Sequence, residues 1–211
     1  DSPRRMRRTL FPLVLAGLVW CVSTSAHPRT TDYRTLHLRL SRPRAATFNV
    51  RDFGAVGNGV DKDTQAIRNA IAAVSAAGSG VVLFPSGGRF LTAPFNVTSH
   101  CTLYIDAGAT ILGSQDKEDW PLIPALPSYG QAKKGGTARR MSLIHGENLT
   151  DIIVTGKNGT VDAQGSVWWE HKVKGDTPPH LFEIMWSMDV EISHVTLRNS
   201  PFWTVHPVFV R

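Results

Sequence analysis

From Gly80 onward the chain is a succession of short apolar or β-branched runs that are parted by Gly, Asn, Asp or Pro. Strands of this length are too short to build a β-sandwich, but they suit coils that each add one strand to several parallel sheets. The pattern predicts an all-β fold, a parallel β-helix. The runs lie at residues 81–84, 89–92, 103–105, 110–112, 152–154, 160–161, 181–185, 190–192 and 195–197.

The spacing of the runs predicts where the chain leaves the coil. Leu83 and Tyr104 are 21 residues apart, which is about one coil of a solenoid. The steps from Leu103 to Ile152 and from Ile152 to Val190 are longer. We therefore expect loops that bulge out of the coil at roughly residues 114–140 and 163–179.

One helix is predicted ahead of the strands, between Asp63 and Gly78. Asp63 is expected as its N-cap, and Gly78 is expected to close it in the left-handed conformation. Such a helix would cover the open apolar end of the first coil. Its apolar residues lie on one stripe at helical spacing, namely Ala66, Ile67, Ala70, Ile71 and Val74.

The N-terminal 26 residues are expected to be a secretory signal peptide. Arginines at positions 4–8 precede an apolar run at 10–22, and small residues at 23–26 place cleavage near Ala26. The apolar run is shorter than the roughly 20 residues that a membrane span needs, although an uncleaved signal anchor is an alternative. Residues 27–46 are expected to be a linker or disordered arm, with a short strand possible at 36–40, and residues 47–211 are expected to be the β-helix.

The charge distribution argues against a nucleic-acid partner. The net charge is +6 and the pI is near 9.7, but residues 1–44 hold nine of the 23 Lys and Arg residues. From residue 45 onward, the chain has 14 basic and 15 acidic residues. The body of the protein is therefore close to neutral and lacks the basic surface that nucleic acids require.

Three Asn-x-Thr sequons predict N-glycosylation at Asn96, Asn148 and Asn158, which agrees with secretion. The alternative is that some of these are turn residues, above all Asn158 before Gly159. Once the leader is removed, Cys101 has no partner in the chain. It is expected to be a buried thiol or one half of a disulfide to sequence outside the chain.

Six motifs in order resemble glycoside hydrolase family 28, the polygalacturonase-like pectinases of plants. The resemblance runs from about residue 48 to the end and matches the N-terminal half of such proteins. Asn58 stands where an Asp is usual. The motifs are FNVRDFGA at 48–55 with GNG at 57–59, DTQAI at 63–67, GVVLFP at 80–85, GATILGS at 108–114, GTVDAQG at 159–165 with WW at 168–169, and NSPFW at 199–203.

The resemblance implies a right-handed parallel β-helix of the pectin-lyase-like type, monomeric and secreted to the cell wall, that needs no metal or other cofactor. It implies inverting hydrolysis of the α-1,4 bonds between galacturonic acid units of pectin. An inverting enzyme needs a carboxylic acid and a carboxylate roughly 6.5–9.5 Å apart. In this family they are expected from Asn-Thr-Asp and Asp-Asp motifs, helped by Gly-His-Gly and Arg-Ile-Lys motifs.

None of these four motifs occurs in the 211 residues, and His145 is flanked by Ile144 and Gly146. We therefore expect an N-terminal fragment, truncated at its C-terminal end, with no catalytic residue in this chain and no activity of its own. The alternative is a non-catalytic secreted β-helix that binds a cell-wall polysaccharide.

Four residues are candidates for substrate contact. Trp203 and His206 could line the sugar cleft, although Trp203 and Phe202 could instead fill the interior with His206 at a surface turn. Trp168 and Trp169 cannot point the same way, so we expect one in the core and the other, Trp169, at the rim where a sugar could stack.

The only dense basic run in the body, residues 133–140, makes Arg140 a candidate for contact with a polyanion, although such a run is usually a solvated loop. Asp106 and Asp162 sit beside glycine-rich turns, where an Asx turn explains them better than catalysis does.

Overall fold

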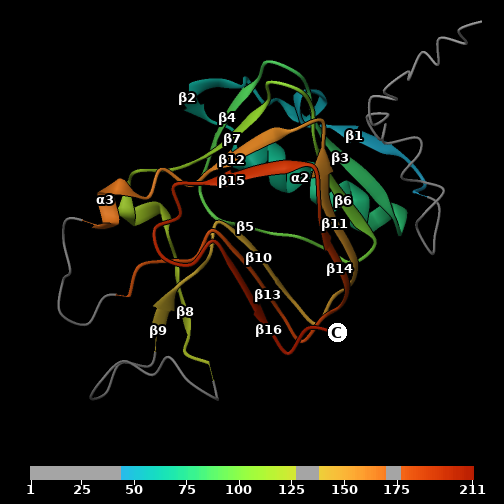
Figure 1. Ribbon diagram of the computed structural model, residues 1–211. Helices are drawn as coiled ribbons and strands as arrows, with labels where there is room; N and C mark the ends of the chain where they lie inside the picture. Colours follow the sequence, from blue (N-terminus) through green and yellow to red (C-terminus); the bar gives the residue numbers. More distant parts are fainter. Residues whose placement is uncertain (1–43, 127–137, 170–176) are drawn as a thin grey trace, which may run out of the picture.

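The computed structural model describes residues 44–126, 138–169 and 177–211, and it shows a parallel β-helix of three sheets (Figure 1). Each coil adds strands to the sheets in turn, as the sequence predicts. Sheet A holds β1 (Thr47–Asn49), β3 (Gly80–Phe84), β6 (Cys101–Ile105), β11 (Thr150–Gly156) and β14 (Met188–Ile192). Sheet B holds β2 (Asn58–Lys62), β4 (Arg89–Thr92), β7 (Thr110–Gly113), β12 (Gly159–Asp162) and β15 (Val195–Arg198). Sheet C holds β5 (Phe95–Asn96), β10 (Ile144–Glu147), β13 (Phe182–Met185) and β16 (Val205–Val208).

The register of sheet A confirms the predicted coil step. Leu83 pairs with Tyr104, and Ile152 pairs with Val190. Leu103 pairs with Val154 and not with Ile152, so the predicted partner of Leu103 was two residues too early in the chain. A shift of two residues keeps the same side chains on the inner face, because the side chains of a strand alternate with period two.

The core lies between the three sheets. Strands β3, β4 and β5 each send a fully buried phenylalanine into it, Phe84, Phe90 and Phe95. The rings of Phe84 and Phe90 meet edge to face with their centroids 5.4 Å apart. Burying such side chains contributes about 1.5–3 kcal/mol each.

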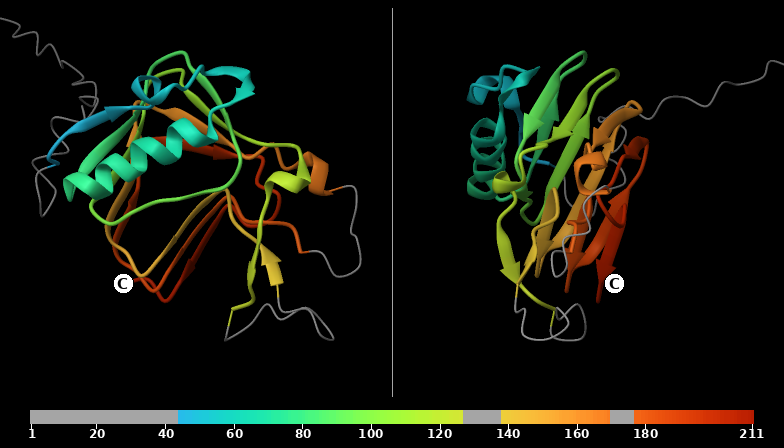
Figure 2. Two further views of the ribbon diagram at one scale, coloured as in Figure 1. Left: turned by 180° about the vertical axis from the view of Figure 1, so that it is seen from behind. Right: turned by 90° about the vertical axis from the view of Figure 1, so that its left-hand side faces the viewer.

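Helix α2 (Thr64–Ala77) lies at one end of the stack of coils (Figure 2). Its five predicted apolar residues are all buried, and Gly78 ends it with φ of +77°. Asp63 precedes the helix, but its side chain makes no capping hydrogen bond there. It instead accepts hydrogen bonds from the backbone N–H groups of Val56 and Gly57, so the carboxylate closes the preceding turn.

Ordered structure begins earlier than the sequence suggested. The guanidinium of Arg44 is buried and donates to both carboxylate oxygens of Asp151, at 2.8 and 3.0 Å, and to Thr102 Oγ1 at 2.9 Å. Residues 44–46, which we assigned to the arm, therefore belong to the folded body. The expected signal peptide, residues 27–43 of the arm and the possible strand at 36–40 lie outside the described residues.

The corners of the coil repeat a left-handed backbone conformation from one coil to the next. Positive φ recurs in three successive coils at the start of the sheet A strands, either just before the strand or at its second residue, and at the residue that follows a sheet C strand. The sequence predicts turns at Gly and Asn, but here large side chains also adopt this conformation. The two columns are His100, Asp151 and Asp189, and Asn148, Trp186 and Phe209.

Two excursions leave the coil at the predicted places, and both leave between sheet B and sheet C. The first carries a 3-10 turn, η2 (Lys117–Asp119), and the antiparallel pair β8 (Leu122–Pro124) and β9 (Ala138–Arg140). The second carries the short helix α3 (Ser166–Trp169). Among the described ranges, no helix has the length and apolar character needed to cross a membrane.

Candidate functional site

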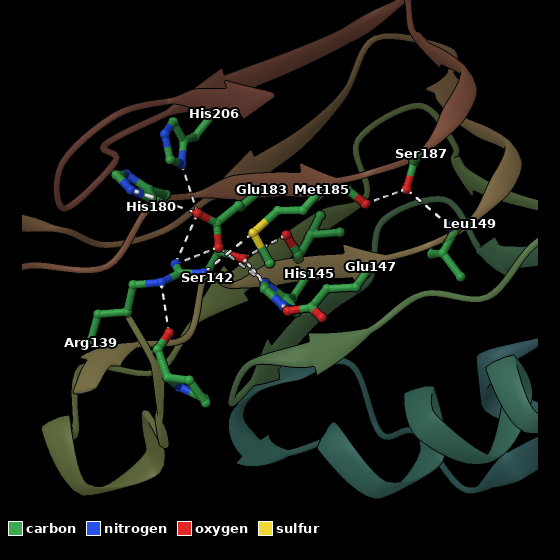
Figure 3. A network of polar contacts seen from close by, with 12 residues as sticks. Arg139, Ser142, His145, Glu147, Leu149, His180, Glu183, Met185, Ser187 and His206 are labelled. Atoms are coloured by element: carbon green, nitrogen blue, oxygen red, sulfur yellow. Dashed lines mark hydrogen bonds and ion pairs between the residues drawn. The ribbon is translucent and has the colours of Figure 1, made fainter. Parts of the chain in front are cut away.

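The outer face of sheet C carries a column of polar side chains. His145, Glu183 and His206 are in register on β10, β13 and β16. Their neighbours Ile144 and Phe182 face the core, so alternation along each strand turns the polar residues outward. All three are nevertheless buried, because Arg139 of β9 and the segment before β13 cover this face (Figure 3).

Glu183 is the centre of the cluster and is completely buried. Arg139 Nη1 donates to both of its carboxylate oxygens, at 2.6 and 2.9 Å. His206 Nδ1 lies 2.6 Å from Oε1, and His145 Nδ1 lies 3.3 Å from Oε2. Burial alone would raise the pKa of Glu183, but the hydrogen bonds from His145 and Arg139 and the charge of Arg139 lower its pKa to about 2.

His180 lies just before β13 and stacks on the aromatic rings of the last coil. Its ring centroid is 5.5 Å from that of Phe202, 5.4 Å from that of Trp203 and 4.2 Å from that of His206. Burial and the neighbouring His206 lower the pKa of His180 to about 4. Its Nδ1 atom is buried and has no hydrogen-bond partner among the described residues.

These side chains border a hollow of about 210 Å³, which we call the aromatic cavity. It offers flat apolar faces from Phe202 and Trp203, a neutral imidazole at His180 and a guanidinium at Arg139. Apolar walls with few polar groups are typical of small-molecule sites. The cavity is lined by Leu126, Arg139, Thr177, His180, Phe202, Trp203 and His206.

His180, Glu183 and His206 also place three potential metal ligands within 4.8 Å of one another. The carboxylate of Glu183, however, already binds the guanidinium of Arg139. A metal ion there would compete with a buried cation and leave Arg139 without its counter-charge, which is costly. The geometry therefore fits an ion-pair network better than a metal centre.

Both Trp203 and His206 line the aromatic cavity. Whether they contact a substrate stays a prediction. The alternative that put Phe202 and Trp203 in the interior is wrong, because their exposed fractions are 48% and 47%. The alternative that put His206 at a surface turn is also wrong, because His206 is buried within β16.

The tryptophan pair divides as predicted, with Trp168 in the core and Trp169 at the rim, 53% exposed. Arg140 does not reach the aromatic cavity. It donates to the backbone carbonyls of Lys117 and Trp120, at 2.9 and 3.1 Å, and its guanidinium lies 5.3 Å from the centroid of Trp168. Its neighbour Arg139 lines the cavity instead, and residues 133–137 of the basic run lie outside the described residues.

The remaining predicted residues have local explanations. Asp162 Oδ1 accepts from the N–H of Gln164 in an Asx turn, and Asp106 Oδ1 accepts from the N–H of Ala107. Cys101 is a buried thiol, and burial raises its pKa to about 12. The three sequon residues Asn96, Asn148 and Asn158 are exposed.

Sequence reasoning missed Arg139, His180 and Glu183. One signal was available: β10, β13 and β16 read IHGE, FEIM and VHPV, each with an ionisable residue at its second position. An in-register stack of the strands would have brought these residues together. Nothing in the sequence indicated that Arg139 would fold back over them.

Comparisons with known proteins agree with this fold. Residues 92–207 match the model of glycosyl hydrolases family 28, and residues 47–118 match that of rhamnogalacturonase A/epimerase, pectate lyase-like. A probable polygalacturonase of Vitis vinifera is 46% identical over 173 residues, which are 80% of this chain and 35% of that protein. The chain spans about a third of the length of the curated relatives it matches.

Two solved structures have the same architecture. A hyperthermoactive exopolygalacturonase from Thermotoga maritima matches with a TM-score of 0.65 and 20% identity, over 86% of this chain and 48% of that one. A polygalacturonase from Erwinia carotovora ssp. carotovora matches with a TM-score of 0.55 and 25% identity, over 75% and 43%.

Proposed function

Because the chain belongs to glycosyl hydrolase family 28, we propose that it forms part of a polygalacturonase that hydrolyses α-1,4-galacturonosyl bonds of pectin with inversion. The proposal is supported by a relative named as a probable polygalacturonase and by a cavity suited to a sugar ring.

The observation that carries the proposal is the aromatic cavity on the outer face of sheet C. Trp203 offers a face on which a pyranose ring can stack, and His180 adds a neutral imidazole to the lining. His206 borders the same space. Trp169 lies outside this cavity. Arg140 remains a proposed contact for a longer substrate, although it would first have to release two backbone carbonyls.

Glu183 is unsuited to be either the acid or the base of this reaction. A general acid must hold a proton near the working pH, but the pKa of Glu183 is lowered to about 2. A general base needs a lone pair that faces water, but both of its oxygens are occupied by Arg139, His145 and His206. We propose that Glu183 orders the cavity and that the catalytic pair comes from the Asn-Thr-Asp and Asp-Asp motifs of the family, neither of which is in these residues.

The biological setting is part of the same proposal. We propose a monomer without cofactor that is secreted to the cell wall, cleaved near Ala26 and glycosylated at Asn96, Asn148 and Asn158. The exposure of these three asparagines supports the glycosylation. To test the glycosylation, the protein is secreted from plant cells and its intact mass is measured before and after deglycosylation. An unchanged mass would contradict glycosylation at these sites.

The test of the function compares the 211-residue chain with the complete reading frame of its gene. We expect the complete protein to release reducing ends from polygalacturonate and the 211-residue chain to release none. Both should bind tetragalacturonate, and Trp203→Ala should weaken that binding about ten-fold, which corresponds to about 1.4 kcal/mol. Trp186→Ala, which removes another exposed indole, is the matched control. Hydrolysis by the 211-residue chain would contradict the assignment of the catalytic pair.

A second function, non-catalytic binding of a wall polysaccharide, would use the same aromatic cavity. The same experiment separates the two functions. If the complete protein binds tetragalacturonate but releases no reducing ends from polygalacturonate, the chain is a binding module and not a hydrolase.

A further inference from the structure

A second hollow, the Trp169 pocket, is lined by residues of α3 and by residues at or just beyond the ends of sheet B strands. Figure 1 shows α3 on the side of the β-helix where these strands end. Its volume is about 220 Å³. It shares no lining residue with the aromatic cavity. The pocket is lined by Gln115, Asp162, Gln164, Ser166, Trp169 and Asn199.

Three successive coils each contribute an amide side chain to the pocket. Gln115 follows β7, Gln164 follows β12 and Asn199 follows β15. These strands are neighbours in sheet B, so the three amides come from adjacent coils, each at a different step beyond its strand. Together they give the pocket three neutral polar side chains.

Internal hydrogen bonds fix which way two of these amides point. Gln164 Nε2 donates to the carbonyl of Gly113 at 2.7 Å, and Asn199 Nδ2 donates to Asp162 Oδ1 at 3.0 Å. Their nitrogens are thus used within the fold. The two amide oxygens have no donor among the described residues and are available as acceptors.

Trp169 forms an immobilised apolar wall. Its Nε1 donates to the carbonyl of Ser200 at 3.1 Å, which holds the polar edge of the indole while the side chain stays 53% exposed. The preceding Trp168 is buried and meets Trp120 edge to face at 5.8 Å. This anchor orients α3, so that Trp169 is presented without a further loss of conformational freedom on binding.

The charge of the pocket decides which ligand it can take. Its single carboxylate, Asp162, is neutralised by Arg198, whose Nε lies 2.9 Å from Oδ2. No cation is among the lining residues, and the oriented amides offer oxygens that accept hydrogen bonds. A sugar hydroxyl can donate to such oxygens, whereas a uronate carboxylate cannot and would be repelled by them.

We propose that the Trp169 pocket binds a neutral, hydroxyl-rich sugar residue, with the ring stacked on Trp169 and its hydroxyls donating to Gln164 and Asn199. This goes beyond the proposed function, because the galacturonan backbone is charged at every unit. Neutral side chains of a wall polysaccharide would be held here while a uronate backbone occupies other parts of the protein.

The test measures binding of two probes to the 211-residue chain by NMR titration: β-1,4-galactotetraose, which is neutral, and α-1,4-tetragalacturonate. Trp169→Ala should weaken binding of the neutral probe at least about ten-fold and leave tetragalacturonate binding unchanged. Trp186→Ala is the matched control, since it removes an indole that is 39% exposed elsewhere.

A second variant reverses the charge preference without touching the fold. Gln115 is exposed, so Gln115→Arg should leave stability unchanged and add a cation at the pocket. Tetragalacturonate should then compete with the neutral probe, which it should not do in the parent chain. The inference would be overturned if Trp169→Ala bound the neutral probe as tightly as the parent chain does. It would also be overturned if the parent chain did not bind the neutral probe at millimolar concentration. If the parent chain bound the neutral probe but not tetragalacturonate, only the proposed function would be overturned.

Discussion

Arg139 Nη1 lies 2.6 Å from Glu183 Oε2 and so ties β9, outside the coil, to β13 within it. Arg139 also lines the aromatic cavity; the Glu183 side chain is fully buried and that of Arg139 is 9% exposed. The first excursion is therefore held to the body of the β-helix by a charge pair that water cannot replace.

Removal of either partner of this pair should be strongly destabilising. Arg139→Ala leaves the Glu183 carboxylate buried without its cation, and the expected loss in the free energy of unfolding is about 3–5 kcal/mol. Urea unfolding of Arg139→Ala, Glu183→Gln and the double variant gives the coupling. We expect the double variant to be more stable than Arg139→Ala, and additive losses would show that the pair does not interact.

The free energy of unfolding should fall as the pH is lowered, over two ranges that overlap between pH 4.5 and about 4. The pKa of His180 is lowered from 6.5 to about 4, so protonation favours the unfolded chain, and its contribution is lost as pH falls from 6.5 to about 4. The loss is on the order of 3 kcal/mol. The pKa of Glu183 is lowered from 4.5 to about 2, so its contribution is present above 4.5 and is lost below that, toward pH 2. Thermal unfolding of His180→Phe should lack the first slope only, and an unchanged slope would refute the assignment.

Cys101 should be inert in the folded protein. Burial raises its pKa to about 12, so almost no thiolate is present at pH 8, and reagents cannot reach the sulfur. In a Cys21→Ser variant, which leaves a single thiol, we expect no reaction with a thiol reagent until denaturant is added. Rapid labelling of the native protein would contradict the position of Cys101 in β6.

Gly156 should tolerate no side chain. A Cβ atom there would lie 1.8 Å from the carbonyl oxygen of Ile105 on the neighbouring coil, and backbone cannot move aside. We expect Gly156→Ala to cost more than about 3 kcal/mol in unfolding free energy. Gly87→Ala is the control: φ is +73° but no atom lies within 4 Å, so the cost should stay near 1–2 kcal/mol. If the two variants lost the same unfolding free energy, Gly156 would not lie against the backbone of Ile105.

The coil and the helix could be predicted because their signals are local. Period-two runs, the apolar stripe from Ala66 to Val74 and the turn glycines each depend on a residue's own neighbours in sequence. The left-handed corners at Asn148 and Asn158 follow from the same local chemistry. Those at Trp186 and Phe209 do not, because stacking on adjacent coils imposes a conformation that bulky residues avoid.

The site was harder to predict because it depends on how distant segments come together. His145, Glu183 and His206 meet only once the strands are stacked in register, and the partner of Glu183 comes from an excursion without periodicity. Trp203 and Trp169 could be picked out by residue type, but which of two different hollows each one borders depends on the course of the two excursions.

Both excursions depart from the same flank, between sheet B and sheet C, whereas the other two edges turn directly at left-handed residues. Insertions and deletions can accumulate on that flank without disturbing a single ladder of the solenoid. Related chains can thus diverge in what they recognise while their scaffold stays constant, and loop grafting at residues 114–140 is the natural way to redirect specificity.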